Sequence, residues 1–294
     1  MAAEHLIALS AITLIAATVN GALGYGFSSL TVPMALLFVN NRVLNPALVC
    51  IEVALNAYVL FVNRASLPAV WRRMLPILVG LPPGIVAGTA VVASINPSWM
   101  KFWTFLCLVP LIFFQAAGIR RPFTARSERR MGPAIGGGLG TLYAVTTISG
   151  PPLAVLLSNQ GYATRDFRAA LGLVRLAEST LTAAAYLYAG MFTATSLGLS
   201  MLILPSLALG VPLGALIVRR VRGDVFRRIC MSFDAWVVAF GLASILRLLG
   251  IASTPVAFAM FASIATLDLW LLYRFFRRPA KRVVVGVPST AVTE

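Results

Sequence analysis

Charged residues are scarce in this chain of 294 residues: they make up 11% of it, against 59% hydrophobic residues. Soluble domains carry about 25% charged residues, so the chain lacks the polar surface that a water-soluble globule of this size needs. No polar stretch is long enough to form a soluble domain of its own. The composition therefore predicts an all-α integral membrane protein.

Histidine and cysteine are nearly missing as well. The single histidine is His5, and the cysteines Cys50, Cys107 and Cys230 lie far apart inside apolar runs. This argues against a histidine metal site, a histidine-based catalytic dyad, disulfides and a zinc site. No GxxxxGK[ST] phosphate loop occurs, which argues against direct use of ATP. We expect no enzyme activity, no metal and no cofactor.

Basic residues outnumber acidic ones, with 24 Lys+Arg against 9 Asp+Glu and a net charge of +15. The arginines separate long apolar runs instead of lining a polar face, so the charge does not indicate nucleic-acid binding. Four basic clusters, at residues 64–73, 120–130, 219–228 and 274–282, are instead expected in the cytoplasm by the positive-inside rule.

Eight stretches are apolar enough for membrane helices, each of which needs about 20 residues. They are residues 5–19, 45–63, 74–95, 98–118, 168–190, 194–218, 229–249 and 251–273. Two further apolar segments, residues 20–40 and 131–158, are rich in glycine and proline, so we expect them to be broken rather than continuous helices.

The basic clusters constrain how these segments cross the membrane. If every cluster is cytoplasmic, an even number of crossings must separate one cluster from the next. Three apolar segments lie between the second and third clusters, which is odd. A re-entrant hairpin at residues 131–158 restores the parity. Two short crossings in the same segment would also do so, but the segment is barely long enough for them.

An internal repeat is also visible. Leu75-Pro76 is followed by Gly80-x-Pro82-x-Gly84, and Leu204-Pro205 is followed by Gly210-x-Pro212-x-Gly214. Each copy contains one broken segment and three spans. Because three is odd, the second copy is expected to be inverted relative to the first.

The repeat predicts a single membrane domain with a defined order of parts. Repeat 1 covers about residues 20–118, a basic cytoplasmic loop 119–131, repeat 2 about 132–249, an extra helix 251–273 and a tail 274–294. Residues 5–19 then form an extra first span. We expect the protein in the cell inner membrane, with both termini in the cytoplasm.

Inverted repeats with paired broken segments are typical of secondary transporters. Two glycine-rich tips entering from opposite faces would meet near the middle of the bilayer, where non-helical backbone is tolerated only if it is buried or faces a water-filled cavity. The alternative interpretation is that the glycines only allow close helix packing. The presence of two such segments in corresponding positions favours a binding site.

The glycine motifs resemble those of a known family. Residues 20–33 resemble the first-half motif of the TauE/SafE sulfite-exporter family, also called the 4-toluenesulfonate uptake permease family, although Tyr25 and Phe27 interrupt the glycine run. Residues 137–140 with 149–152 resemble the second-half motif. The resemblance implies a transporter of small organic or sulfur-containing anions, such as sulfite or sulfonates, coupled to an ion gradient.

An anion would suit the broken segments, because exposed N–H groups at half-helix N-termini favour negative charge and glycine lets backbone approach a ligand closely. For each hydroxyl, the alternative is a bond to its own or a neighbouring helix. The candidate substrate-binding residues are Gly24, Gly26, Ser28, Ser29, Gly138, Gly140, Thr146, Thr147, Ser149, Gly150 and Arg175.

Ionisable residues deep in a span are costly and tend to be functional or paired. Glu52 lies mid-span with Asn56 one turn later, and Arg175 and Glu178 share a helix face. We hypothesise that Glu52 and Glu178 serve ion coupling by exchanging a proton, while Arg175 balances charge or attracts the anion. The alternative is a purely structural network of Arg175 with Glu178 and Glu52.

Two aspartates have a different setting. Asp234 follows Arg227 and Arg228 by about two turns, and Asp268 precedes Arg274. Both are expected near cytoplasmic helix ends, so ion pairs at the membrane interface are a better interpretation than a role in transport.

Other functions stay open at this stage. An anion channel can share inverted repeats and hairpins with a transporter. An intramembrane enzyme acting on lipids usually needs histidines or paired acidic residues, and the spans lack both. The expected partners are a small anion and the lipid bilayer, without nucleic acid, and a homo-oligomer is left open.

Overall fold

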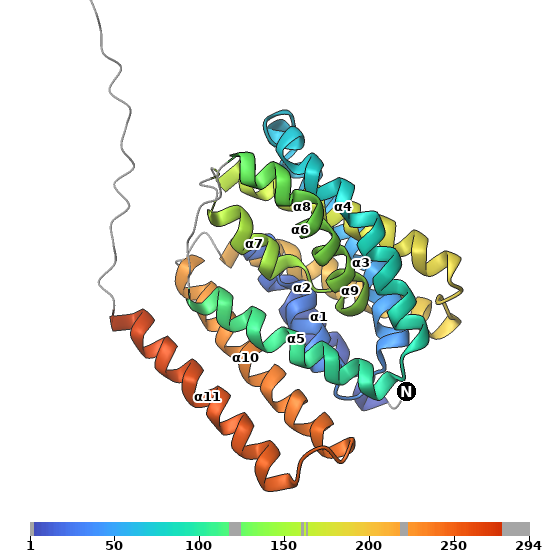
Figure 1. The fold of residues 1–294 in the computed structure, drawn as a ribbon, viewed down its shortest axis with the longest axis vertical. Helices are drawn as coiled ribbons and strands as arrows, with labels where there is room; N and C mark the ends of the chain where they lie inside the picture. Colours follow the sequence, from blue (N-terminus) through green and yellow to red (C-terminus); the bar gives the residue numbers. More distant parts are fainter. Residues whose placement is uncertain (1–2, 118–124, 160–161, 163, 218–222, 278–294) are drawn as a thin grey trace, which may run out of the picture.

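A computed structural model gives the fold of the chain (Figure 1). It describes residues 3–117, 125–159, 162, 164–217 and 223–277, and among them it contains no strand. The elements in chain order are α1 (Ala3–Leu23), α2 (Phe27–Ala35), α3 (Asn41–Val62), the 3-10 turn η1 (Arg64–Ser66), α4 (Leu67–Ser94), α5 (Pro97–Ala117), α6 (Ala125–Thr146), α7 (Gly150–Asn159), α8 (Thr164–Tyr188), α9 (Ala194–Ile217), α10 (Gly223–Leu248) and α11 (Thr254–Arg277).

Six of the described helices are long and apolar enough to cross a membrane. They cover Glu4–Leu23, Asn41–Val62, Arg64–Ser94, Ala194–Ile217, Met231–Leu248 and Thr254–Arg277. The expectation of an all-helical multi-pass membrane protein is therefore confirmed, but a count of eight spans is not. The helices α5 and α8 are not among the six, and α8 carries several charged side chains, including Arg175 and Glu178.

Both glycine-rich segments contain a helix break. Between α1 and α2, Gly24 and Gly26 have φ angles of 84° and 107°, a region that favours glycine. Between α6 and α7, Thr147 has a φ of 56°, which is strained for a β-branched residue. The predicted boundaries need correction, because α1 continues without interruption through residues 19 and 20 and α6 begins before residue 131. Residues 5–19 are therefore part of α1, a longer helix that ends at Leu23, just before the first break.

The helices α3 and α8 pack against each other and run antiparallel. Val49, in the first half of α3, packs in one cluster with Tyr186 near the end of α8. Further along α3, the Nδ2 atom of Asn56 donates to the carbonyl oxygen of Arg175, 3.3 Å away and earlier in α8. Asn56 therefore points toward α8, the helix that carries Arg175 and Glu178.

Each long arm of a broken helix lies along a helix from the other half of the chain: α1 packs against α9, and α6 against α4. The repeated glycines make these contacts. A Cβ at Gly80 or Gly84 would overlap with the backbone of α6, and a Cβ at Gly210 or Gly214 would overlap with atoms of α1. For these four glycines, close packing of small residues in the membrane explains the motif.

Replacing Gly214 with alanine should destabilise the contact between α9 and α1. The added Cβ would overlap with the backbone carbonyl oxygen of Thr18, which has no freedom to rotate away, and overpacking costs about 1–3 kcal/mol. The matched control is Gly198→Ala in the same helix, where a Cβ meets no atom within 4 Å. The melting temperature in detergent should fall for Gly214→Ala only. Equal melting temperatures would contradict this packing.

The first described residues and the last lie at opposite ends of the helices. The ring of His5 stacks on Phe38 at a centroid distance of 5.2 Å, so α1 starts beside the turn between α2 and α3. The helix α9 runs parallel to α1, with Ser206 donating to the carbonyl oxygen of Ser10, so α10 begins at the far side. The end of α11 lies on that far side too (Figure 1). The described ends of the chain thus lie on opposite sides of the helices, whereas the sequence predicts both termini in the cytoplasm.

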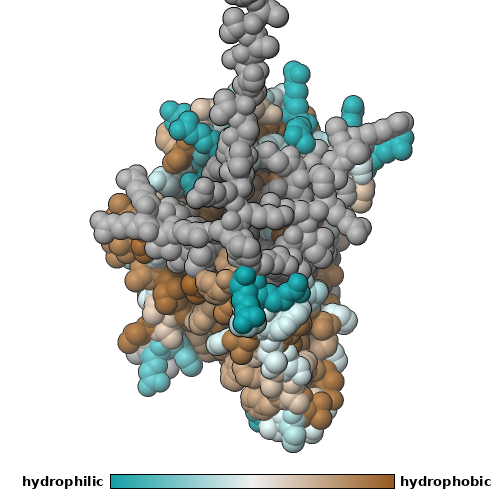
Figure 2. All heavy atoms as spheres, turned by 90° about the vertical axis from the view of Figure 1, so that its left-hand side faces the viewer, coloured by the Kyte–Doolittle hydropathy of each residue, from teal (hydrophilic) through white to brown (hydrophobic). Residues whose placement is uncertain are grey.

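Large apolar side chains cover much of the outer surface. Figure 2 shows hydrophobic residues over much of one face, with the hydrophilic residues in separate groups. Exposed side chains include Phe61, Val79, Leu187 and Met201. Of the six candidate spans, α11 is the least buried. Large exposed apolar areas of this kind suit the hydrocarbon interior of a bilayer.

Candidate functional site

The two helix breaks come together in the interior of the protein. Gly150 is the first residue of α7, and a Cβ placed on it would lie 3.4 Å from the Cβ of Tyr25 in the first break. The same Cβ would lie 3.3 Å from Nη1 of Arg175 on α8. Because glycine has no side chain, both helix breaks can approach the Arg175 guanidinium closely at position 150.

Glu52 of α3 is fully buried and links three other helices. Its Oε1 atom accepts hydrogen bonds from the Ser28 hydroxyl of α2 and from Nη2 of Arg175, the latter at 2.6 Å. Its Oε2 atom accepts a hydrogen bond of 2.6 Å from the Tyr143 hydroxyl of α6. Such charge-assisted bonds are the strong ones inside a protein. Glu52 thus connects α2, α6 and α8 in one polar network.

Glu178 lies one turn after Arg175 on α8 and is also fully buried. It accepts a hydrogen bond from Ser149, the last residue of the second break. Its Oε1 atom, and the Nε and Nη1 atoms of Arg175, have no hydrogen-bond partner among the residues that the structure describes. Buried polar atoms without partners are costly unless a ligand or water satisfies them. The centre therefore offers donors and an acceptor that a ligand could use.

Six of the thirteen predicted site residues lie together in the structure. Gly24 faces the side chain of Arg168, and Gly26 caps the start of α2. The predicted residues that meet around the central network are Ser28, Glu52, Ser149, Gly150, Arg175 and Glu178.

Other predicted residues are not brought into this network. Gly138 is exposed on α6, and Gly140 packs against the Leu81 carbonyl oxygen of α4. The hydroxyl of Thr146 donates to the Leu142 carbonyl oxygen and that of Thr147 to the Thr146 carbonyl oxygen, both at 2.7 Å. These threonine hydroxyls thus bond their own backbone, which was the alternative interpretation of the sequence.

The two half-helices differ in what their N-termini can donate. In α7, Gly150 is followed by Pro151 and Pro152, so two residues of the first turn have no N–H group. In α2, Phe27, Ser28 and the half-buried Ser29 keep theirs. The expectation of an anion-favouring N-terminus therefore applies to α2 much better than to α7.

Two residues at the helix breaks, Tyr143 and Arg168, were not predicted from the sequence. Tyr143 lies one turn before the second break, and its aromatic ring in an apolar segment gave no sign of a polar role. Arg168 donates from Nη2 to the Ala22 carbonyl oxygen, 3.3 Å away, at the end of α1. Arg168 lies seven residues before Arg175, which places both arginines on one face of α8, about two turns apart. This spacing is the feature of the sequence that could have indicated a place for Arg168 near the site.

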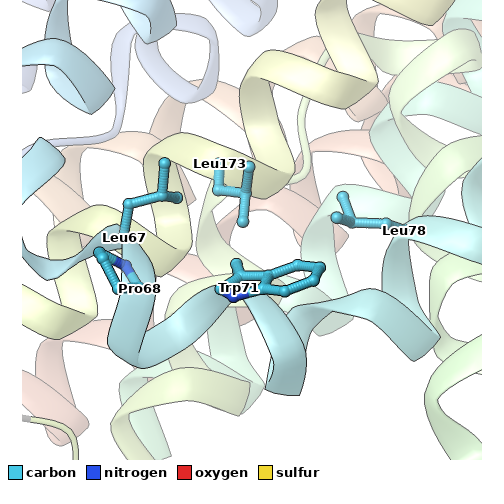
Figure 3. A pocket seen from close by; sticks show the side chains of 5 residues that line it. All are labelled: Leu67, Pro68, Trp71, Leu78 and Leu173. Atoms are coloured by element: carbon cyan, nitrogen blue, oxygen red, sulfur yellow. The ribbon is translucent and has the colours of Figure 1, made fainter.

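The described part of the chain also has an apolar groove. A groove of about 540 Å³ between α4 and α8 is lined by Leu67, Pro68, Trp71, Leu78 and Leu173 (Figure 3). This lining is apolar and does not suit an anion. Among the described residues, no three His, Cys, Asp or Glu side chains are grouped so that they could hold a metal ion.

The expected ion pair of Asp268 is present, but its partner is Arg228 of α10 rather than Arg274. Nη2 of Arg228 lies 2.9 Å from Oδ1 of Asp268, and both side chains are buried. The side chains of Asp234 and Arg227 lie outside the described residues.

Comparisons with known proteins agree with the motif resemblance. Residues 9–241 match the family model described as Sulfite exporter TauE/SafE, a stretch that includes both breaks and the central network. No curated protein matches the chain significantly, and no solved structure does. Because the family model covers most of the sequence, the chain belongs to the TauE/SafE sulfite exporter family of membrane transporters.

Proposed function

We propose that the protein carries small anions across the cell inner membrane by alternating access at the interface between its two halves. The proposed substrates are sulfite, organosulfonates or related sulfur-containing or organic anions. One observation carries this proposal: Arg175, a buried guanidinium with two nitrogens that have no hydrogen-bond partner among the described residues, lies where the two broken helices meet. A fixed cation at such a point favours an anionic ligand.

The proposed architecture is an inverted repeat of α1–α5 and α6–α10. When each helix is replaced by its counterpart in the other half, the contacts between helices correspond. The contact of α1 with α9 corresponds to that of α6 with α4, the contact of α3 with α9 to that of α8 with α4, and the contact of α2 with α10 to that of α7 with α5. The corresponding helices α3 and α8 run antiparallel, as a twofold axis in the membrane plane requires. On this proposal the first unit begins with α1 rather than near residue 20.

We further propose that both broken helices are re-entrant and enter from opposite faces. The turn η1, the start of α8 and the end of α11 carry basic residues, and on this proposal they lie on the cytoplasmic side. The α6–α7 hairpin then enters from the cytoplasm and the α1–α2 hairpin from outside, which puts the start of α1 outside. Labelling of a cysteine introduced at Ala3 in whole cells by a membrane-impermeant reagent tests this orientation.

Coupling to an ion gradient is proposed to use the two buried carboxylates. Glu52 and Glu178 face one guanidinium, Arg175, so the centre carries one more acidic group than basic groups. A proton taken up by one of the two carboxylates would balance this excess.

Flux measurements in proteoliposomes test the proposed function. A carrier should take up labelled sulfite or a sulfonate with saturation kinetics, and an imposed proton gradient should change the rate. Flux that grows without saturation and follows the membrane potential alone would favour an anion channel instead. The absence of flux for sulfite, sulfonates and carboxylates would contradict the proposal.

Two neighbouring serines provide a sharp comparison within the site. Ser28→Ala should slow uptake by about tenfold or more, because it removes a hydrogen bond to a charged group, worth about 1.5–3 kcal/mol, from Glu52. Ser29→Ala, on the same turn of α2, should change uptake by less than about twofold, since α2 keeps its backbone donors. Equal losses in both variants would contradict the role given to Ser28.

A further inference from the structure

We propose that the Glu52 carboxylate occupies the anion site when no substrate is bound, and that substrate and Glu52 compete for Arg175, so that one proton enters with each anion. This inference rests on the proposed function and specifies how its coupling works. It assigns the exchangeable proton to Glu52 and not to Glu178.

The position of one oxygen atom carries the argument. Oε1 of Glu52 lies between the Ser28 hydroxyl, on the first turn of α2, and Nη2 of Arg175. A hydroxyl and a guanidinium that converge on one point from different helices form an oxyanion site, and here the protein's own carboxylate fills it. The unused Nε and Nη1 atoms of Arg175 would bind further oxygens of the incoming anion.

Displacement of Glu52 from Arg175 has a necessary electrostatic consequence. The groups that face Glu52 are Ser28 of α2, Tyr143 of α6, and Arg175 and Glu178 of α8. Once the anion holds Arg175, none of the remaining three groups is a cation. A carboxylate that stays buried without its cation is strongly penalised, so Glu52 takes up a proton from the aqueous side that is open at that time.

The hydrogen bonds around Glu52 can accommodate this proton. A protonated carboxyl group has one O–H donor, and the Ser28 hydroxyl can accept from it after reversing its own direction, while Tyr143 continues to donate. Each monovalent anion then enters with one proton and adds no net charge to the interior. When the anion leaves, the Glu52–Arg175 pair forms again and the proton is released to the same side.

Isothermal titration calorimetry of the purified protein with methanesulfonate, and with 4-toluenesulfonate as a second probe, tests the inference. Both anions keep their charge between pH 5 and 9, so any proton uptake belongs to the protein. Titrations in buffers with different ionisation enthalpies should give about one proton bound per anion. By linkage, the affinity should weaken about tenfold for each unit of rising pH.

Two carboxylate variants locate the proton. Glu52→Gln should bind the sulfonate without proton uptake, with an affinity that no longer depends on pH and is higher than that of the wild-type protein at alkaline pH. Glu178→Gln, which alters the other buried carboxylate, should still take up one proton. If one variant does not fold, the other still locates the proton, because retained uptake in Glu52→Gln, or lost uptake in Glu178→Gln, would each place the proton away from Glu52.

The outcomes separate this inference from the proposed function. Flux and binding without proton uptake, or loss of the proton in Glu178→Gln rather than in Glu52→Gln, would overturn the inference and leave anion transport standing. If neither sulfonate binds, the inference fails. If proteoliposomes also show no anion flux, the proposed function fails with it.

Discussion

Arg175→Gln should reduce anion uptake in proteoliposomes by about 100-fold. The guanidinium is 1% exposed and is bound to Glu52 at 2.6 Å. Removing one partner of a buried, hydrogen-bonded charge pair costs about 2–5 kcal/mol, and each 1.4 kcal/mol corresponds to about tenfold in a binding constant. The loss combines a missing anion contact with an unpaired Glu52 carboxylate, so it should exceed the effect of Ser28→Ala.

The conservative variant Arg175→Lys separates charge from geometry. An ammonium group keeps the positive charge but lacks the planar fork of N–H donors with which arginine binds the oxygens of a carboxylate or another anion. Partial activity is expected, between that of the wild-type protein and that of Arg175→Gln. Uptake by Arg175→Gln at the wild-type rate, in protein that elutes as a single folded species in detergent, would rule out Arg175 as the anion contact.

The positions of the helices were predictable because a bilayer imposes a simple rule on the sequence. Long apolar runs become helices, and α9 at Ala194–Ile217 matches the predicted residues 194–218 almost completely. The first segment was less predictable. No charge or proline separates residues 19 and 20, so the end of α1 at Leu23 depends on the positive φ angle of Gly24 rather than on composition.

The buried charged residues of the candidate site were predictable from the sequence, but their pairing was not. Helix periodicity places Arg175 and Glu178 on one face, and the cost of burying charge draws attention to both and to Glu52. The structure pairs Arg175 with Glu52 instead, because α3 and α8 cross where these two side chains face each other. Tyr143 joins them only through the position of α6, and no local pattern in the sequence encodes such a contact between helices.

Asp268→Ala should lower the free energy of unfolding by about 3–5 kcal/mol, the cost of leaving one partner of a buried ion pair uncompensated. Asp268 is fully buried although α11 is the least buried of the candidate spans, and Arg228 of α10 is 4% exposed. The Nε and Nη1 atoms of Arg228 already lack hydrogen-bond partners within the described residues. Without the Asp268 carboxylate, the guanidinium would lose its ionic partner as well and would keep only the 3.3 Å hydrogen bond from Nη2 to the backbone carbonyl oxygen of that residue.

The double variant Arg228→Met/Asp268→Leu is the matched control, since apolar residues of similar volume often replace a buried ion pair at little or no cost. Its melting temperature in detergent should therefore return close to that of the wild-type protein. It should also transport anions at the wild-type rate, because neither Arg228 nor Asp268 contributes to the network around Glu52. If the double variant is stable but inactive, α11 takes part in transport and the site is larger than the two broken helices and the crossing of α3 with α8.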